Sequence, residues 1–132
     1  MRQIAFASAL MTVPSHGATQ ELVTGNDILN ACRTMSDSIA VEAGFCVGHI
    51  IGTWEGAKFG AASVLSAAMP EATASELESA VNNFLNVCLP LEFESGQMVD
   101  LFMVRLEERP ASRHESARSL LVAMLSETYP CV

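Results

Sequence analysis

Cysteine and histidine are the residues of this sequence that could do chemistry, and their spacing decides which kind. The four cysteines, Cys32, Cys46, Cys88 and Cys131, lie far apart, and no Cys-x-x-Cys pair typical of a structural zinc site occurs. Cys46 and His49, one helical turn apart, could form a nucleophile and its base, but only if the thiol stays free. We interpret the even number of cysteines as two disulfides, for which three pairings are open.

Other catalytic patterns are missing from the sequence. No GxSxG, HExxH, phosphate-binding or dinucleotide-binding motif occurs. Carboxylate pairs such as Glu107/Glu108 are common on protein surfaces and do not by themselves indicate acid–base catalysis. The sequence therefore predicts no catalytic residue, no cofactor and no metal site, and the protein is not expected to be an enzyme.

The chain is acidic, with a formal net charge of −8 among 132 residues. Nucleic acid is not expected as a partner, because a nucleic-acid-binding surface needs clustered Lys and Arg. Between Lys58 and Arg105 there is no basic residue, and the interval holds six carboxylates: Glu71, Glu76, Glu78, Glu92, Glu94 and Asp100. Such a segment either serves solubility or docks a basic partner. For the second alternative we take Glu92, Glu94 and Asp100 as the candidate contact residues.

The first 18 residues have the pattern of an export signal. Arg2 precedes an apolar run, and small residues follow near a plausible cleavage site. This order is typical of a secretory signal peptide; the alternative is a packed N-terminal helix. The run is too short to cross a bilayer, which takes about 20 apolar residues, so no membrane insertion is expected. We expect a signal peptide over residues 1–18 and one domain over residues 19–132.

Five helices and no strand are expected, so the predicted fold is all-α: a small compact helical domain held by two disulfides. Three segments begin with a Ser or Thr followed three residues later by an acid, which is capping-box spacing. Each segment has apolar residues at helical spacing, and prolines stand where helices should stop. The predicted helices begin at Thr24/Asp27, near Gly44, at Thr73/Glu76, after Ser95 and at Ser112/Glu115, with prolines at positions 70, 90, 110 and 130.

The same spacing predicts which side chains face the core. We expect these to be Ile28, Leu29, Cys32, Met35 and Ile39; Val47, Ile50, Ile51 and Trp54; Leu77, Val81, Phe84 and Leu85; Met98, Leu101, Phe102 and Leu106; and Leu120, Leu121, Met124 and Leu125.

Glycine recurs at every fourth position of the second predicted helix, at Gly44, Gly48, Gly52, Gly56 and Gly60. Each glycine costs about 1 kcal/mol of helix stability relative to alanine, so the pattern needs a reason. Steps of four residues trace a ridge on a helix, and glycines flatten that ridge. We expect another helix to pack closely there, within the chain or in a homodimer. The alternative is a helix that the glycines loosen and that frays after Gly56.

Six short stretches in fixed order resemble one family. They are "LNAC", "FCVGHIIG", "CLP", "SGQMVDLFMVRLEERP", "HESA" and "LLVAMLSETYPC", and together they cover about residues 22 to 131. The sequence resembles the Rap/Tai family of type VI secretion immunity proteins. The resemblance implies a small, secreted, helical, periplasmic protein that binds and blocks a cell-wall-degrading effector, typically a peptidoglycan amidase.

The order of the predicted helices favours one disulfide pairing. Cys32 and Cys46 flank the turn between the first two helices. Cys88 precedes the fourth helix and Cys131 follows the fifth, so an antiparallel pair of helices would bring them together. We therefore expect Cys32–Cys46 and Cys88–Cys131.

Two kinds of function fit these patterns. The first is a rigid inhibitor that occludes the active site of a cognate effector with a loop or a helix end. The alternative is a periplasmic acid-stress chaperone, which would loosen at low pH, or another disulfide-bonded helical binding protein.

Overall fold

The structure is a computed structural model that describes residues 22–34 and 41–131. Its elements are α1 (Gly25–Arg33), α2 (Val41–Ala68), α3 (Ala74–Leu85), α4 (Ser95–Glu108), the 3₁₀ helix η2 (Pro110–Ser112) and α5 (Ala117–Thr128). The described residues contain no strand beyond an isolated bridge between Thr24 and Ser116. The prediction of an all-α fold with five helices is confirmed. No described helix is long and apolar enough to cross a bilayer.

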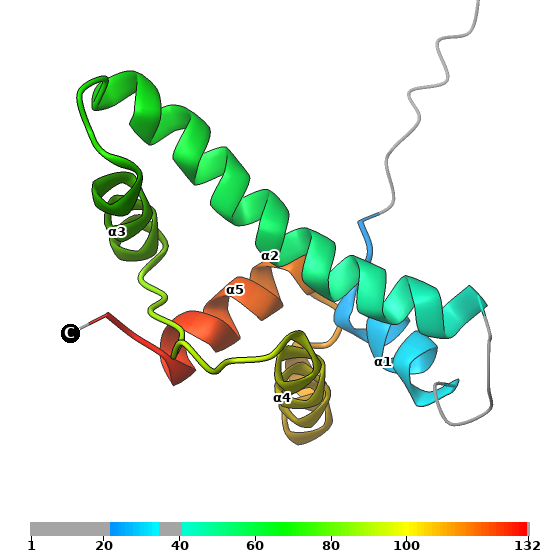
Figure 1. Cartoon of the computed structure of the whole chain (residues 1–132). Coiled ribbons are helices and arrows are strands. Elements are labelled where there is room, and N and C mark those ends of the chain that lie inside the picture. The colour runs from blue at the N-terminus through cyan, green and yellow to red at the C-terminus, as the bar shows by residue number, and fades with distance from the viewer. Residues whose placement is uncertain (1–21, 35–40, 132) are drawn as a thin grey trace, which may run out of the picture.

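The longest helix, α2, organises the molecule (Figure 1). Helices α1, α4 and α5 pack around its N-terminal half, whereas α3 packs along its C-terminal half. We call α1, α4, α5 and residues 41–54 the body, and residues 55–85, which end with α3, the arm. The chain leaves the arm through the loop of residues 86–94, which returns it to the body.

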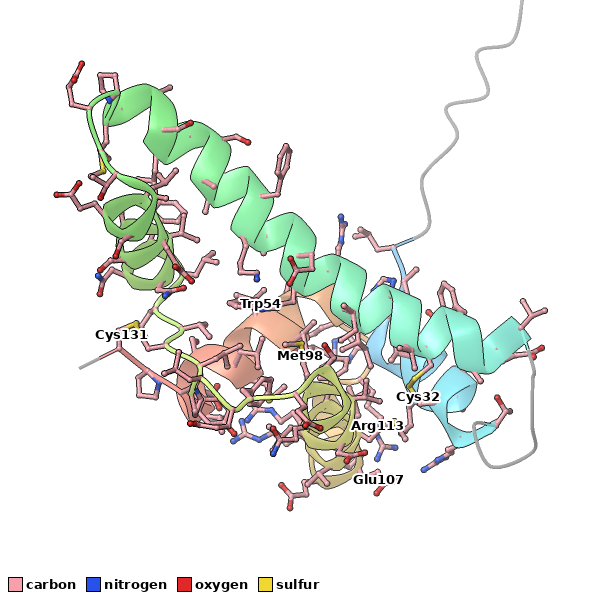
Figure 2. The ribbon with its side chains drawn as sticks, in the orientation of Figure 1. Cys32, Trp54, Met98, Glu107, Arg113 and Cys131 are labelled. Atoms are coloured by element: carbon pink, nitrogen blue, oxygen red, sulfur yellow. A yellow bond between two sulfur atoms is a disulfide. The ribbon has the colours of Figure 1, made fainter. Side chains whose placement is uncertain are left out.

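The hydrophobic core lies in the body. Figure 2 shows Trp54 of α2 and Met98 of α4 between their two helices, and both side chains are buried. Phe102 is the largest side chain of the core that is wholly buried. The buried members of the core are Ile28, Leu29, Ala31, Cys32, Cys46, Ile50, Trp54, Val87, Met98, Val99, Phe102, Leu106, Ala117, Leu120, Leu121, Met124 and Leu125.

Most predicted core positions are confirmed, and two are wrong. Val47 is exposed because it lies to one side of the buried stripe of Cys46, Ile50 and Trp54. Phe84 is exposed because only one helix packs on α3, which leaves the rest of its surface in solvent. Positions 35 and 39 lie outside the described residues.

Two of the three predicted capping boxes form. In α1 the Asp27 amide donates to Thr24 Oγ1 at 3.3 Å, and the Thr24 amide donates to the Asp27 carboxylate at 2.8 Å. Thr73 and Glu76 repeat the pattern at α3, with the same two distances. These boxes satisfy amides that the first turn of a helix leaves unpaired. Helix α2 begins at Val41, three residues before the predicted start, and ends at Ala68 as expected.

The predicted Ser112/Glu115 box is wrong. Pro110 begins the 3₁₀ helix, and Ser112 Oγ donates to the Arg109 carbonyl at 3.2 Å instead of capping a helix. The next residues pair with the chain before α1, since the Gly25 amide donates to the Glu115 carbonyl at 3.1 Å. This pairing holds the backbone extended, so α5 begins only at Ala117.

Gly25 lies at this junction for a packing reason. A Cβ atom there would lie 2.8 Å from Leu106 Cδ2, 2.9 Å from Leu120 Cδ1 and 3.1 Å from the Arg113 carbonyl oxygen. Both leucines are buried, so neither can move aside freely. The start of α1 can approach α4 and α5 this closely because residue 25 has no side chain.

The disulfides are Cys32–Cys46 and Cys88–Cys131, which confirms the favoured pairing. The first joins the last turn of α1 to the first half of α2 and is buried in the core. The second joins the loop after α3 to the segment after α5, and Cys88 is exposed. No cysteine is free.

Candidate partner-binding surface

The loop of residues 86–94 leaves α3 through a tight backbone reversal. Asn86 adopts a left-handed conformation with φ 52°, and its amide donates to the carbonyls of Asn82 and Asn83. Asparagine tolerates this region better than most residues, so it suits a helix end of this kind. The Val87 amide then donates to the Asn82 carbonyl at 3.0 Å, and the Val87 side chain is buried in the core. The loop therefore starts from a fixed point.

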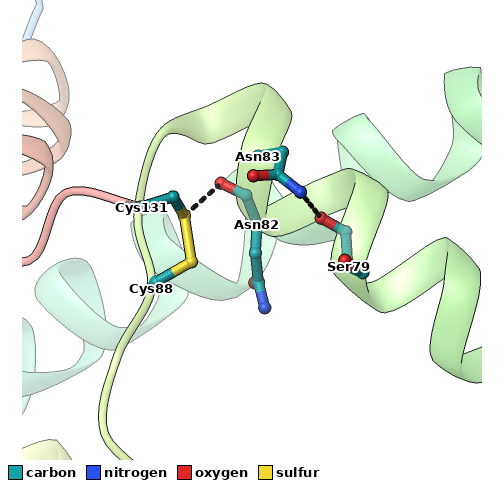
Figure 3. Close-up of a disulfide and its surroundings, with 5 residues drawn as sticks. All are labelled: Ser79, Asn82, Asn83, Cys88 and Cys131. Carbon is teal, nitrogen blue, oxygen red and sulfur yellow. Dashed lines mark hydrogen bonds between the residues drawn. A yellow bond between two sulfur atoms is a disulfide. The ribbon is translucent and has the colours of Figure 1, made fainter.

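The disulfide fixes the next residue (Figure 3). The Cys88 amide donates to the Tyr129 carbonyl at 2.8 Å, beside the bond from Cys88 to Cys131. The Cys131 sulfur also lies 3.5 Å from the Asn82 carbonyl oxygen. A disulfide sulfur carries no proton, so this is a packing contact and not a hydrogen bond. Three segments, the end of α3, the loop and the chain after α5, thus meet at this bond.

The middle of the loop is a turn that presents one apolar side chain. The Phe93 amide donates to the Pro90 carbonyl at 3.0 Å, which places Leu91 and Glu92 at the centre of the turn. Leu91 is 99% exposed, the most exposed large hydrophobic residue among those described. Exposure of an isolated leucine is ordinary, but here the backbone on both sides is held in place.

The exit of the loop is anchored by an aromatic contact. The rings of Phe93 and Tyr129 meet edge to face with centroids 5.3 Å apart, an arrangement that aromatic pairs favour. The Glu94 amide then donates to the Gln97 side chain at 2.8 Å as α4 begins. Anchors at Cys88 and Phe93 therefore leave only the tip of the loop without packing contacts.

The three predicted contact residues surround this loop. Glu92 is in the turn, Glu94 precedes α4, and Asp100 lies on the exposed side of α4. All three are exposed, and none forms an ion pair with another described residue. Asp100 and Tyr129 line a shallow hollow of about 270 Å³, so the hollow and the loop share the Tyr129 ring. The apolar side chain of Leu91 and the three unpaired carboxylates therefore belong to one region of the surface, around the loop of residues 86–94.

The other three carboxylates of the acidic interval lie on the arm. Glu71 follows the end of α2, Glu76 caps α3, and Glu78 lines a groove between α2 and α3. Hydrogen bonds from the amide and the hydroxyl of Thr73 lower the pKa of Glu76. The six acidic residues are therefore divided between the arm and the loop with α4.

The basic residues that follow the acidic interval bind mainly within the chain. Arg105 makes a bidentate pair with Glu127 at 2.6 and 2.9 Å, and Arg109 approaches the same carboxylate at 3.8 Å. These charges lower the pKa of Glu127, the hydrogen bond from Arg105 being the largest cause. Arg113 donates to the Leu106 and Glu107 carbonyls, which closes the C-terminus of α4 (Figure 2 labels Arg113 and Glu107).

The predicted glycine ridge packs against none of the other described residues. All five glycines are exposed, and a Cβ atom on any of them would meet nothing within 4 Å. The prediction that another described helix packs closely there is therefore wrong, while packing against a second subunit stays a prediction. Gly48, Gly52 and Gly56 instead border an open groove of about 560 Å³, whose other wall is Arg118 and Val122 of α5.

The pair of Cys46 and His49 does not form a catalytic site. The Cys46 sulfur is bonded to Cys32 and buried. His49 Nε2 is buried and has no hydrogen-bond partner among the described residues. Burial, and secondarily the charge of Arg118, lower the pKa of His49. His114 lies exposed in the turn before α5 and not in a capping box. Among the residues described, no three His, Cys, Asp or Glu side chains gather as a metal site would need.

Leu91 is the residue that sequence reasoning missed. Its signal is the alternation in "CLPLEFE", where apolar and acidic side chains follow a cysteine and a proline. The disulfide fixes the base of this stretch, and the turn exposes Leu91 while Phe93 packs inward.

Comparison with known proteins gives one match. The family model of Rap1a immunity proteins matches residues 24–131. No curated protein and no solved structure matches the chain. The matched range begins at the cap of α1 and ends at Cys131, so it includes all five helices and both disulfides.

Proposed function

The chain belongs to the Rap1a immunity protein family, and from this we propose that it protects its producer by binding a secreted type VI effector and blocking that effector's active site. The proposed effector is a peptidoglycan amidase, and the proposed location is the periplasm. Two disulfides and the leader-like pattern of the first 18 residues support an oxidising compartment.

The observation that carries the proposal is the anchored loop. Leu91 extends from a turn whose two ends are fixed by the Cys88–Cys131 bond and by the contact of Phe93 with Tyr129. Binding energy at protein interfaces concentrates in a few side chains that become fully buried. An apolar tip held in place loses little conformational freedom when it binds. Leu91 is therefore the proposed anchor in the effector's groove.

The carboxylates around the anchor have a separate proposed role. Glu92, Glu94 and Asp100 form no ion pair within the described chain, so they can face a basic surface. Charges at the edge of an interface mainly raise the association rate, and salt screens them. We assign affinity to Leu91 and association rate to the three acids.

Two sets of variants separate these roles in binding kinetics against a type VI effector, to be sought first among the genes next to this one. Leu91→Asp should weaken binding about 30-fold or more, mainly through faster dissociation. Val64→Asp on the arm is the matched control, since it makes the same kind of change at another exposed apolar residue. It should bind like wild type.

Charge reversal at Glu92 and Glu94 to Lys should slow association at low salt, and the difference should shrink as salt rises. The matched control reverses Glu71 and Glu78, which are exposed on the arm and also lack ion pairs. Equal slowing in both double variants would assign the effect to net charge and reject the loop surface.

The immunity function and the proposed surface fail in different ways. A chain that protects cells and binds the effector, yet is unaffected by Leu91→Asp, keeps its function and loses the proposed anchor. A chain that neither binds nor protects against any effector encoded next to its gene overturns the immunity proposal itself.

A further inference from the structure

Helix α4 and the residue that follows α5 form the hollow beside the anchored loop. Its lining consists of Gln97, Asp100, Leu101 and Val104 of α4 together with Tyr129, and its volume is about 270 Å³. The four α4 residues follow the spacing of one helix face, so they point to the same side. Pockets for small molecules are usually larger, from about 300 Å³ upward. The hollow therefore suits one side chain of a protein partner.

The walls of the hollow are held in place by contacts outside it. The Tyr129 amide donates to the Leu125 carbonyl at 2.8 Å, and the Tyr129 carbonyl accepts from the Cys88 amide at 2.8 Å. The Tyr129 ring meets the ring of Phe93, and Leu101 packs against the core. A side chain that enters the hollow therefore does not have to order its walls first, which lowers the cost of binding.

Most of the lining is apolar, and its one charge is Asp100. Val104 is 50% exposed, whereas Leu101 and Tyr129 are half-buried. The side-chain oxygen of Gln97 already accepts a hydrogen bond from the backbone at the start of α4. Asp100 forms no hydrogen bond or ion pair with another described residue, so it is the acceptor that a partner can reach.

The basic residues near the end of α4 are not available to Asp100. Arg105 and Arg109 both approach the Glu127 carboxylate instead. An apolar side chain in the hollow would take water away from Asp100 without replacing its hydrogen bonds, which costs free energy. An acidic side chain would be repelled by the same carboxylate. The hollow therefore favours a positively charged occupant.

Lysine and arginine side chains match both properties of the hollow, because they carry a charged end on an apolar stem of three or four methylene groups. We propose that the hollow receives a Lys or Arg side chain of the effector. Its stem lies against Leu101, Val104 and Tyr129, and its charged end pairs with Asp100. This inference rests on the proposed function, since the hollow shares Tyr129 with the loop that presents Leu91.

Asp100 then has a role that Glu92 and Glu94 lack. All three carboxylates raise the association rate through their charge. The pair that Asp100 forms in the hollow is also partly shielded from water, and salt screens such a pair less than an exposed one. Loss of this pair should therefore speed dissociation, which loss of a carboxylate at the edge of the interface does not do.

Binding kinetics against the effector compare two variants that remove the same charge. Asp100→Asn should raise the dissociation rate about tenfold, and the rise should persist at high salt. Glu92→Gln is the matched control, because it removes an exposed carboxylate that does not line the hollow. It should change mainly the association rate at low salt. Equal dissociation rates of the two variants would overturn the proposal.

A second pair of variants fills the hollow without changing its charge. Val104→Phe places a ring where the basic side chain should lie, and it should weaken binding about tenfold. Val64→Phe makes the same change at an exposed valine of the arm and should bind like wild type. Circular dichroism checks that both variants are folded. Wild-type affinity of Val104→Phe would show that the hollow is empty in the complex and would contradict the proposal.

A titration without the effector tests the hollow by itself. The probes are Nα-acetyl-arginine amide and Nα-acetyl-citrulline amide, in which a neutral urea replaces the charged guanidinium. The arginine probe should shift the amide NMR signals of residues 97–104 and Tyr129, the citrulline probe should not, and Asp100→Asn should abolish the shifts. No shift, or equal shifts around Glu71 and Glu78 of the arm, would overturn the site.

The two levels of the proposal fail separately. If the probe shifts these signals but the chain binds no effector, the immunity proposal fails and the cation site stands. If the chain binds the effector but the probe shifts nothing, the site fails alone.

Discussion

The two ends of α2 lie in different surroundings. In the body, three helices cover the first half of α2 and bury Cys46, Ile50 and Trp54 against a continuous core. In the arm, only α3 packs on the second half, and the buried residues of the two segments are Ala61 and Val81. The same helix thus passes from a core into a two-helix hairpin that has little core of its own.

The difference shows two ways of holding a helix in place. Burial holds the body, because removing apolar surface from water gives roughly 25 cal/mol per Å². The arm depends more on local features: the Thr73/Glu76 box, the left-handed turn at Asn86 and the Cys88–Cys131 bond. Residues of the arm and the loop can therefore vary at small cost to the fold, which suits surfaces that must match a partner.

Truncating one phenylalanine in each region gives the largest expected contrast. Phe102→Ala, in the body, should lower the free energy of unfolding by about 3–5 kcal/mol, because a buried ring leaves a cavity. Phe84→Ala, in the arm, removes a ring that is 66% exposed and should change it by no more than about 0.5 kcal/mol. Chemical denaturation measures both. Similar losses would mean that the arm has a core of its own.

Replacing a glycine in each region should give opposite signs. Gly25→Ala puts a Cβ atom against two buried leucines and a backbone carbonyl, so it should destabilise the fold by about 1–3 kcal/mol. Gly60→Ala meets open space on a helix and should stabilise it by up to about 1 kcal/mol. Thermal melts of dilute protein compare the two. Destabilisation by Gly60→Ala would show that this part of α2 is not free.

Removing one cap in each region tests whether body and arm open together. Thr73→Ala should lower the hydrogen-exchange protection of α3 amides about fivefold, since a lost cap costs about 1 kcal/mol. Thr24 caps a helix of the body. Thr24→Ala should therefore leave the hydrogen-exchange protection of α3 amides unchanged, because the arm opens without unfolding α1. An equal effect of Thr24→Ala on α3 amides would mean that the two regions unfold as one unit.

Acid weakens both caps in the same direction. Hydrogen bonds from Thr24 and Thr73 lower the pKa values of Asp27 and Glu76. A carboxylate whose pKa is lowered by folding stabilises the fold above its unfolded value of about 4, and that contribution is lost as pH falls through the lower folded value. Melting temperatures should therefore hold near neutral pH and fall below about pH 4, and each Thr→Ala variant should reduce that fall.

Local features could be predicted from the sequence, whereas most features that depend on distant neighbours could not; the Cys88–Cys131 bond is the exception. The boxes at Thr24 and Thr73 formed because their partners lie three residues away. The box at Ser112 did not form, because the backbone that follows it hydrogen-bonds to the segment at the start of α1. The disulfide pairing followed from which helix ends meet.

The glycines show the same limit. The interval of four predicted a flat ridge, but only the fold shows that none of the described helices lies against it. The glycine that does meet close neighbours is Gly25. It is not part of the four-residue glycine repeat, so the sequence pattern does not single it out. At the candidate site, the exposure of Glu92 and Glu94 was expected from their charge. Exposure of Leu91 depends on the turn, which hydrophobicity alone cannot predict.

The Cys88–Cys131 bond also has a consequence for the order in which the protein matures. Under the proposed export, Cys32 and Cys46, which are 14 residues apart, can join as soon as the first two helices have crossed into an oxidising compartment. Cys131 follows α5, so under the same proposal its bond with Cys88, 43 residues earlier, cannot close until all five helices have been translocated. The loop that presents Leu91 is fixed only at that moment. A chain stalled during export would therefore hold an oxidised α1–α2 pair and an unfinished loop.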